Sequence, residues 1–260
     1  MSLLVAQDLG IAFGGVVAVD GVSFSAAPGQ VLSIIGPNGA GKTTLFNLVS
    51  GLYRARRGRV TLNGEDVTGA QPQVLAAKGL SRTFQNLQVF GRMTACENVM
   101  AGRHLRERRS LAADLFRLPA VRRQNRETRA AAEELLAFVR LGERGDTPAG
   151  ALPYGALKRL EIARALAPEP KALLLDEPAA GCNAVETTEI DRLIRAVADR
   201  GVAVVLVEHD MKLVMKISDR ILVLDGGRPL AEGTPAEVRA NPDVIRAYLG
   251  PQHGREAAHA

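Results

Sequence analysis

Short apolar runs that end in polar turns set the hydrophobic pattern of this chain. Val31 to Ile35, Ala172 to Leu175 and Val202 to Val207 are unbroken or nearly unbroken apolar stretches, as buried parallel strands are. Between the last two, apolar residues recur at helical spacing from Ile190 to Val197. This alternation of strand and helix predicts a parallel sheet covered by helices, with right-handed crossovers.

Two further regions follow other patterns. Near the start of the chain, apolar and polar residues alternate between glycine-containing turns, which predicts an antiparallel layer. Ala, Arg and Glu dominate residues 87–152, which carry an apolar helical face and predict a mostly helical insertion. Residues 234–237, Thr-Pro-Ala-Glu, form a capping box that predicts a C-terminal helix. The apolar positions concerned are Val5, Val17, Val19, Val22, Phe24, Val60 and Leu62 for the layer, and Ala131, Leu135, Phe138 and Val139 for the helical face.

Composition places the chain among ordinary globular proteins. Its 260 residues are 47% hydrophobic and 23% charged, and no apolar run approaches the ~20 residues that cross a bilayer. The first residues include Gln7 and Asp8 and lack a basic stretch before a long apolar run, so we expect no secretory signal. Cys96 and Cys182 are too few for a disulfide scaffold, which favours a reducing cytoplasm.

Positive charge is concentrated in one segment. The formal net charge is +5, and nine arginines between Arg103 and Arg129 accompany only Glu107, Asp114 and Glu127. A solvated helical face is the favoured interpretation, with an acidic lipid surface or nucleic acid as alternatives. Phe116 is the one aromatic residue among these arginines, so a base-stacking platform is not expected.

The strongest chemical motif follows the first apolar run. It is a GxxxxGK motif followed by Thr, placed between a predicted strand and a predicted helix: Gly36-Pro37-Asn38-Gly39-Ala40-Gly41-Lys42-Thr43-Thr44. Glycines let backbone N–H groups converge on phosphate oxygens, and the helix N-terminus adds partial positive charge. We expect Lys42 to reach the β and γ phosphates, Thr43 to bind Mg²⁺, and Thr44 to lie near the α phosphate. The sequence therefore predicts a site for Mg-ATP.

Acidic residues end the other two apolar runs. Asp176 closes one strand where a phosphate-binding enzyme needs a carboxylate for magnesium, and Glu177 follows it as the candidate general base. His209, after the next strand, is the candidate group for hydrogen bonding the γ-phosphate or orienting water. A lone histidine is more often structural, but the carboxyl edge of a parallel sheet favours the functional interpretation.

Together these residues resemble those of an ATP-binding cassette (ABC) ATPase, the motor subunit of ABC transporters, over nearly the whole chain. Thr83-Phe84-Gln85-Asn86 resembles the family's glutamine loop, and Leu152-Pro153-Tyr154-Gly155 resembles its signature. The likeness implies that Gln85 contacts Mg²⁺ or the attacking water and that Phe13 stacks on adenine. Taken alone, Phe13 fits a core position equally well.

The resemblance also implies a fold class and a domain organisation. The fold is an α/β P-loop NTPase with a parallel-sheet core, an N-terminal antiparallel β layer and a helical signature subdomain. Residues 1–260 form a single ABC ATPase domain. Within it, residues 1–86 and 160–260 form the nucleotide-binding core, and residues 87–159 form the helical subdomain.

The signature opens a helix expected at Ala156 to Leu166, whose N-terminus can offer N–H groups to an anion. In the family that anion is the partner's ATP, so Tyr154 and Gly155 are expected on the nucleotide of a second ATPase in a head-to-tail dimer. Residues 179–183 resemble the loop that crosses this interface. Pro153 and Ala156 replace the family's usual Ser and Gln, which predicts a weakened half-site; a proline that merely suits the start of a helix is an equal alternative.

Within the family, the insertion after Gln85, residues 160–166, residues 208–211 and the ending Asn241 to Leu249 most resemble the ATPases of branched-chain amino acid importers. Such systems imply a homodimer or a heterodimer with a related ATPase, two transmembrane permeases, and indirectly a periplasmic or lipid-anchored binding protein. Residues 92–97 are then expected to border the groove for a permease helix. The location implied is cytoplasmic, peripheral on the inner face of the plasma membrane, with no nucleic-acid partner.

Alternatives from other classes stay open at this point. The same fold powers lipid extractors and machines that act on DNA or ribosomes, although the latter are expected to carry tandem cassettes, a zinc module or a coiled coil. A small P-loop kinase does not explain the signature together with Glu177. The cargo is not readable, because branched-chain amino acids, urea and short amides all fit.

Overall fold

The structure is a computed structural model that describes residues 2–106 and 119–249. Leaving the other residues aside, the internal contacts divide the chain into two compact units. The first unit comprises Met1–Arg82, Lys171–Glu177 and Ile194–Ala260, and the second comprises Thr83–Pro170 and Pro178–Leu193. Both units are therefore built from segments that lie far apart in the sequence.

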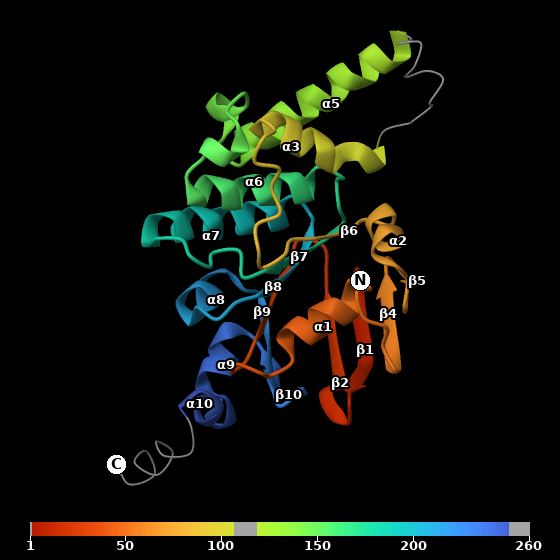
Figure 1. The fold of residues 1–260 in the computed structure, drawn as a ribbon. Helices are drawn as coiled ribbons and strands as arrows, with labels where there is room; N and C mark the ends of the chain where they lie inside the picture. Colours follow the sequence, from red (N-terminus) through yellow and green to blue (C-terminus); the bar gives the residue numbers. More distant parts are fainter. Residues whose placement is uncertain (1, 107–118, 250–260) are drawn as a thin grey trace. The chain divides into compact units, whose positions relative to one another are not determined.

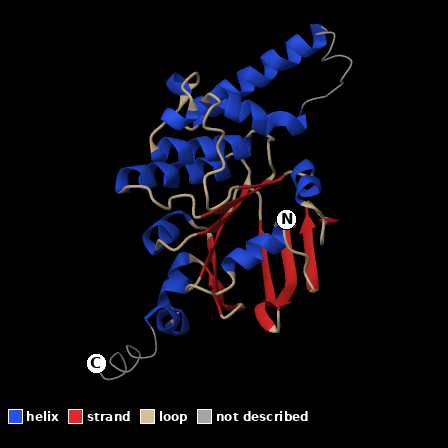
Figure 2. Cartoon of the chain, viewed as in Figure 1, coloured by secondary structure: helices blue, strands red, loops and turns tan. Residues whose placement is uncertain are grey.

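A six-stranded sheet belongs to the first unit (Figure 1 and Figure 2). Strands β3, β7 and β8 are buried at every position, which explains why they are continuous apolar runs. Neighbouring strands are parallel except for the antiparallel pair β9 and β10, so the predicted parallel sheet is confirmed. In spatial order the strands are β10 (Arg228–Gly233), β9 (Arg220–Asp225), β3 (Val31–Ile35), β8 (Ala203–Val207), β7 (Ala172–Asp176) and β6 (Leu80–Arg82).

An antiparallel sheet of four strands belongs to the same unit, in agreement with the predicted N-terminal layer. Strand β1 (Leu4–Phe13) is one of the two inner strands, and its Leu4 lies opposite Ala26 on one side and Leu62 on the other. The order is β2 (Val16–Ala26), β1 (Leu4–Phe13), β4 (Arg57–Leu62) and β5 (Glu65–Asp66).

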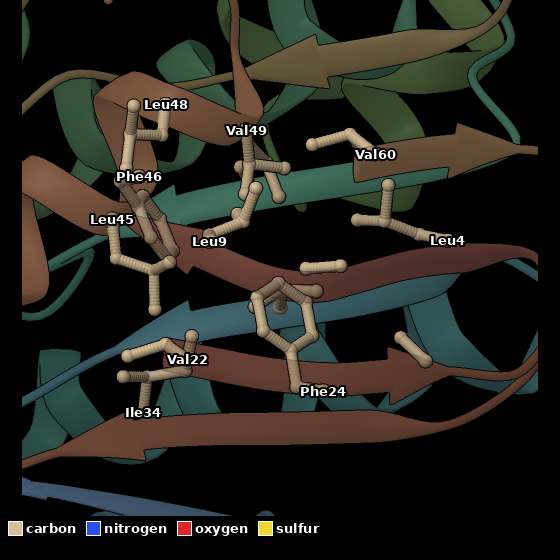
Figure 3. Packing of buried hydrophobic residues seen from close by; sticks show 14 of the residues in the cluster. Leu4, Leu9, Val22, Phe24, Ile34, Leu45, Phe46, Leu48, Val49 and Val60 are labelled. Carbon is tan, nitrogen blue, oxygen red and sulfur yellow. The ribbon is translucent and has the colours of Figure 1, made fainter. Parts of the chain in front are cut away.

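Helix α1 (Lys42–Val49) fixes the core of the first unit because its apolar side chains pack against both sheets (Figure 3). Phe46 is fully buried in one cluster with Leu9 of the antiparallel sheet and Ile34 of the parallel sheet. Burying a side chain of this size stabilises the fold by roughly 1.5–3 kcal/mol. The start of α1, which follows β3 after the loop of residues 36–41, is therefore held in place by the buried face of the helix.

The other face of the parallel sheet carries a second cluster. Ile35 points away from Ile34 because neighbouring strand residues face opposite sides, and it packs with Val223. The helices that cover this face are α8 (Met211–Ile217), α9 (Pro235–Ala240) and α10 (Pro242–Leu249), while α2 (Pro72–Ala77) packs near β6.

Short polar side chains fix several helix starts. The Asp210 carboxylate accepts hydrogen bonds from the amides of Lys212 and Leu213 at the start of α8. Thr234 and Glu237 form the reciprocal bonds of a capping box at α9, as the sequence predicts.

The described part of the second unit is mostly helical, as predicted for residues 87–152. The buried Asn98 side chain accepts from the Phe90 amide and donates to the carbonyl groups of Phe90 and Thr94, which fixes the loop before α3. The elements are α3 (Ala95–Gly102), α5 (Pro119–Phe138), α6 (Tyr154–Leu166), the 3-10 turns η1 (Arg103–Arg106), η2 (Gly142–Arg144) and η3 (Ala149–Ala151), and the first part of α7 (Ala184–Asp199).

Predicted and observed limits differ in two places. The contacts divide the chain after Arg82 and after Pro170, whereas the predicted subdomain spans residues 87–159 and ends inside α6. The functional division at those residues stays a prediction. Helix α6 begins at Tyr154, two residues before the expected Ala156, because Pro153 takes the extended N-cap conformation and the helix starts directly after it.

Most of the described part of the basic segment is exposed, although Thr128 is buried. Arg123 pairs with Glu127 and Arg129 pairs with Glu133 one helical turn away in α5, both with exposed side chains. Because water screens such exposed pairs, they add little to stability, in keeping with a solvated face. Phe116 and residues 107–118 lie outside the described residues. In the described ranges, 2–106 and 119–249, no helix combines the length and apolarity that crossing a membrane requires.

Candidate functional site: the carboxyl edge of the parallel sheet

The candidate functional residues of the first unit gather at one edge of the parallel sheet. Strands β3, β8, β7 and β6 are neighbours that run in the same direction, so their carboxyl ends lie at the same edge. Gly36, His209, Glu177 and Arg82 lie at or within two residues of those ends. Ligand sites of open parallel sheets form outside this edge.

The loop between β3 and α1 adopts a backbone that needs glycine. Gly36 and Gly41 have φ values of 154° and 92°, and added Cβ atoms would lie 2.2 Å from the Leu224 carbonyl oxygen and 2.5 Å from that of Ala18. Gly41 is the N-cap of α1 and provides no side-chain cap. The first amides of this helix have no acceptor inside it, so the loop can offer them to an anion.

Lys42 bridges the two ends of this loop. Its Nζ donates hydrogen bonds to the carbonyl oxygens of Gly36 at 2.7 Å and Pro37 at 2.9 Å. Burial lowers the pKa of Lys42, and attraction to Glu177 and Asp176 opposes that shift. The ammonium group and the two acids predicted to act with it are therefore brought together in the first unit.

Glu177 leaves strand β7 in a left-handed conformation, with φ of 48°. This conformation is uncommon for a residue other than glycine and is often held in place at functional sites. The Glu177 amide donates to the Val207 carbonyl at the end of β8, which anchors the turn. The Glu177 side chain is 23% exposed, whereas that of Asp176 before it is buried at 6% exposure.

His209 lies beside the proposed base. Its Nδ1 is 3.8 Å from Glu177 Oε1 and 3.8 Å from Glu208 Oε2. The imidazole is 64% exposed and Glu177 is 23% exposed, so both groups reach solvent at the sheet edge. The structure therefore places the predicted P-loop, acid pair and histidine in one neighbourhood.

Phe13, the predicted adenine-stacking residue, ends β1 and is 45% exposed, so it is not a core residue. Its ring meets the ring of Tyr53 edge to face, with centroids 5.2 Å apart. The stacking role of Phe13 stays a prediction.

Sequence reasoning missed Arg82 and Tyr248. Arg82 ends β6 and forms a buried ion pair with Asp176, Nη2 to Oδ2 at 3.1 Å. A charged residue at the end of a short strand, three positions before Gln85, is a signal that could have found it. Tyr248 of α10 is hydrogen bonded to the backbone of Gly36, and burial raises the pKa of its phenol. Periodicity alone cannot show this second contact.

The signature residues belong to the second unit. Pro153 is the N-cap of α6 and offers no side-chain cap, and the Gly155 amide donates to Glu186 Oε1 at 3.2 Å. The other oxygen of Glu186 accepts a hydrogen bond from the backbone N–H of Asn183 at 3.0 Å. The Tyr154 hydroxyl donates to the Ala180 carbonyl in the same loop. A carboxylate of this chain thus occupies the amide that the signature is expected to offer to a phosphate.

Gln85 also belongs to the second unit, in the segment that precedes α3. The Glu161 carboxylate of α6 accepts hydrogen bonds from the backbone of Gln88 and Phe84 on either side of Gln85. Burial raises the pKa of Glu161, and nearby Lys158 opposes the shift. Helix α6 therefore holds the glutamine segment through a buried acid.

The residues at the sheet edge fit a nucleotide with magnesium better than a metal alone. Among the described residues, no three His, Cys, Asp or Glu side chains gather closely enough to hold a metal. Magnesium is commonly bound through one or two carboxylates together with phosphate oxygens. One buried carboxylate, Asp176, close to a phosphate-type loop matches that arrangement.

Comparison with protein families gives two matches. The family described as ABC transporter matches residues 19–180. The family described as branched-chain amino acid ATP-binding cassette transporter matches residues 228–250, the stretch with β10, α9 and α10.

Curated proteins match over nearly the full chain. The high-affinity branched-chain amino acid transport ATP-binding protein BraF of Pseudomonas aeruginosa is 47% identical, over 95% of this chain and 98% of BraF. Its counterpart LivG of Escherichia coli is 44% identical with the same coverage. The lipopolysaccharide export system ATP-binding protein LptB of Acidithiobacillus ferridurans is 38% identical, over 96% of this chain and 98% of LptB.

Solved structures agree with these matches. An ATP-binding cassette of an ABC transporter in its ADP conformation has a TM-score of 0.84 and 33% identity, covering 96% of this chain and 99% of that one. A nucleotide-free cassette gives a TM-score of 0.83 at the same identity, covering 96% and 100%. The phosphate-type loop, the acids at the strand ends and these likenesses agree. The chain belongs to the ABC transporter family as an ATP-binding, ATP-hydrolysing subunit.

Proposed function

We propose that this chain is the motor subunit of an ABC importer for branched-chain amino acids or related amino acids and amides. The observation that best supports the motor function is that Lys42, Asp176, Glu177 and His209 lie close together at one sheet edge. The cargo class is supported by the transport that the names of the relatives describe and by the C-terminal family match. The chain acts on the cytoplasmic, inner face of the plasma membrane.

Nucleotide binding rests on main-chain amides and one cation. The amides of the loop from Gly36 to Thr44 grip the phosphates, and Lys42 reaches the β and γ groups. Phe13 stacks on the adenine ring. Thr43, Asp176 and Gln85 are the residues that hold Mg²⁺, which supplies charge neutralisation on the phosphate oxygens when it is bound.

Hydrolysis rests on Glu177. Its carboxylate accepts a proton from a water as the water oxygen bonds to the γ-phosphorus, and the bond to the β-phosphate oxygen breaks to release ADP and phosphate. His209, beside Glu177, hydrogen bonds the γ-phosphate and orients the water. Gln85 contacts the same water from the glutamine segment.

Coupling to transport requires a second ATPase subunit and two permeases. Tyr154 and Gly155 cover the nucleotide of the partner ATPase, so ATP closes a homodimer or a heterodimer with a related chain. Hydrolysis reopens the dimer, and the docked permeases convert closure into alternating access for cargo delivered by a binding protein.

Substitution of Glu177 tests the motor function. We expect Glu177→Gln to retain ATP affinity, to lose roughly 10²–10⁴-fold in turnover, and to accumulate as an ATP-bound dimer. Steady-state ATPase assays, calorimetry and size-exclusion chromatography measure these effects, with Glu169→Gln as a control on an exposed acid. Hydrolysis by Glu177→Gln at the wild-type rate removes Glu177 from this role.

Lipid extraction is the second candidate, supported by the 38% identity to a lipopolysaccharide export ATPase. Reconstitution with the permeases encoded beside this chain separates the two. ATP-dependent uptake of a branched-chain amino acid into vesicles supports import. Removal of lipid from the membrane without such uptake supports extraction.

A further inference from the structure

Arg82 connects the magnesium carboxylate to helix α1. Its Nη2 lies 3.1 Å from Asp176 Oδ2, and its Nη1 donates to Asn47 Oδ1 and Ser50 Oγ, both at 2.7 Å. The guanidinium also lies over the Phe46 ring, 5.6 Å from its centroid. All of these residues belong to the first unit.

The ion pair lies in the interior of the unit. The Arg82 and Asp176 side chains are 8% and 6% exposed. Taking an ion pair out of water is expensive, so a buried pair is weak evidence of a stabilising role. Because the guanidinium is buried, water screens its charge only weakly. Arg82 therefore repels any other cation near Asp176 strongly.

Helix α1 fixes the position of Arg82 independently of Asp176. The Ser50 hydroxyl donates to the Phe46 carbonyl at 2.7 Å, so its oxygen is turned to accept from Arg82. Asn47 supplies a second neutral acceptor on the same helix. The planar fork of arginine suits such a set of acceptors, and a flexible lysine ammonium does not reproduce it.

We propose that Arg82, which is itself anchored on helix α1, is a positioning residue that orients Asp176. Its positive charge also weakens the binding of the divalent cation by Asp176. The proposal rests on the assignment of Asp176 as a magnesium residue under the proposed function. One carboxylate then serves two cations, and the fixed charge of Arg82 keeps the metal exchangeable between turnovers. The direction of the change in metal affinity distinguishes this role from packing alone. Removing a packing residue damages a metal site and lowers its affinity, whereas removing a competing charge raises the affinity.

The test measures metal affinity without turnover. Full-length protein is saturated with ADP and titrated with Mn²⁺, and bound Mn²⁺ is followed by electron paramagnetic resonance. We expect Arg82→Gln to bind Mn²⁺ at least roughly threefold more tightly than wild type, because a nearby positive charge is gone. Arg82→Lys retains the charge without the planar fork, so its affinity for Mn²⁺ is expected to lie between those of wild type and Arg82→Gln.

The variant Asp176→Asn separates failure of the magnesium assignment from failure of the role of Arg82. Asp176→Asn is expected to weaken Mn²⁺ binding by roughly tenfold or more because it removes the carboxylate charge. If Asp176→Asn has no effect, the magnesium assignment in the proposed function fails. If Asp176→Asn weakens binding while Arg82→Gln leaves it unchanged or weaker, the competing role of Arg82 is wrong and the magnesium assignment stands.

A variant that lacks both charges guards against misfolding of the single variant. Arg82→Gln leaves a buried carboxylate without this partner, so the double variant Arg82→Gln/Asp176→Asn serves if the single one does not fold. We expect the double variant to bind Mn²⁺ at least roughly threefold more tightly than Asp176→Asn alone. Equal or weaker binding by the double variant overturns the proposal.

Discussion

Helices α1 and α6 both start without a side-chain cap, yet their N-termini have different surroundings. At α1, the preceding loop combines glycine conformations with the hydrogen bonds of Lys42, all within one unit. At α6, the Gly155 amide already donates to the Glu186 carboxylate. Under the proposed function, the first N-terminus binds phosphate within its own chain, whereas at the second a phosphate must compete with a charge from the same chain.

This difference teaches how a nucleotide can promote dimerisation. If the α1 loop binds ATP alone and α6 binds the partner's ATP only by displacing Glu186, monomer affinity and dimer affinity are set by separate residues. Changes at α6 should then move dimerisation and leave ATP binding to the monomer unaffected.

The largest effect is expected from Gly155→Ala. An added Cβ would lie 2.5 Å from Glu186 Oε1, which accepts from the Gly155 amide, and it would clash equally with a phosphate oxygen that took the place of Oε1. We expect ATP-dependent dimerisation of a Glu177→Gln background to weaken roughly tenfold or more, as one misplaced or lost anion contact warrants. Analytical ultracentrifugation measures this effect.

The control for that variant is Gly145→Ala in the same unit, where an added Cβ makes ordinary contacts from 3.6 Å. Monomer affinity for ATP, measured by calorimetry, is expected to be equal in both variants. A Gly155→Ala protein that dimerises like Gly145→Ala contradicts the role assigned to the signature amide.

A smaller effect of opposite sign is expected from Glu186→Gln. The amide oxygen can still accept from Gly155, but the negative charge that repels a phosphate is gone. We expect ATP-dependent dimerisation to strengthen roughly three- to tenfold. Glu189→Gln is the matched control, because Glu189 pairs with Arg159 rather than with Gly155. Weaker dimerisation by Glu186→Gln shows that its charge supports the interface instead.

Restoring the usual signature side chains is expected to have a still smaller effect. Pro153→Ser together with Ala156→Gln adds a hydroxyl, a backbone donor and an amide near the N-terminus of α6. One or two added hydrogen bonds predict dimerisation about two- to fivefold tighter. Unchanged dimerisation means that Pro153 only begins the helix and that the half-site was not weakened.

The smallest effect concerns the pH dependence of stability at Glu161. Burial raises the pKa of Glu161 above its ordinary value of 4.5, so its ionised form is disfavoured in the folded state. Stability linked to this group is fully present below pH 4.5 and declines as pH rises through the folded-state pKa. Urea unfolding between pH 4.5 and 7 should show a smaller decline for Glu161→Gln than for wild type. An equal decline assigns the pH dependence to other groups.

Sequence patterns predicted the parts of this protein that depend on local spacing. The loop from Gly36 to Thr44 could be found because its spacing, preceding strand and following helix are all local. The parallel sheet followed from continuous apolar runs, and the capping box at Thr234 followed from four consecutive residues. Each of these signals is complete within a short stretch of chain.

Contacts between distant segments could not be predicted in the same way. Arg82 meets Asp176 across 94 positions, and Glu186 meets Gly155 across 31. The left-handed turn at Glu177 depends on a hydrogen bond to Val207 on the neighbouring strand. Neither periodicity nor spacing records which side chains the fold brings to one sheet edge.

Calorimetric titration of ATP into the wild-type chain with Mg²⁺ present, beside Lys42→Ala, tests the central claim most directly. If the amides and ammonium group of this loop hold the triphosphate, wild type binds ATP and Lys42→Ala binds at least roughly tenfold more weakly, because a charge-assisted contact is lost. Absence of ATP binding by wild type, or equal binding by both proteins, contradicts the account.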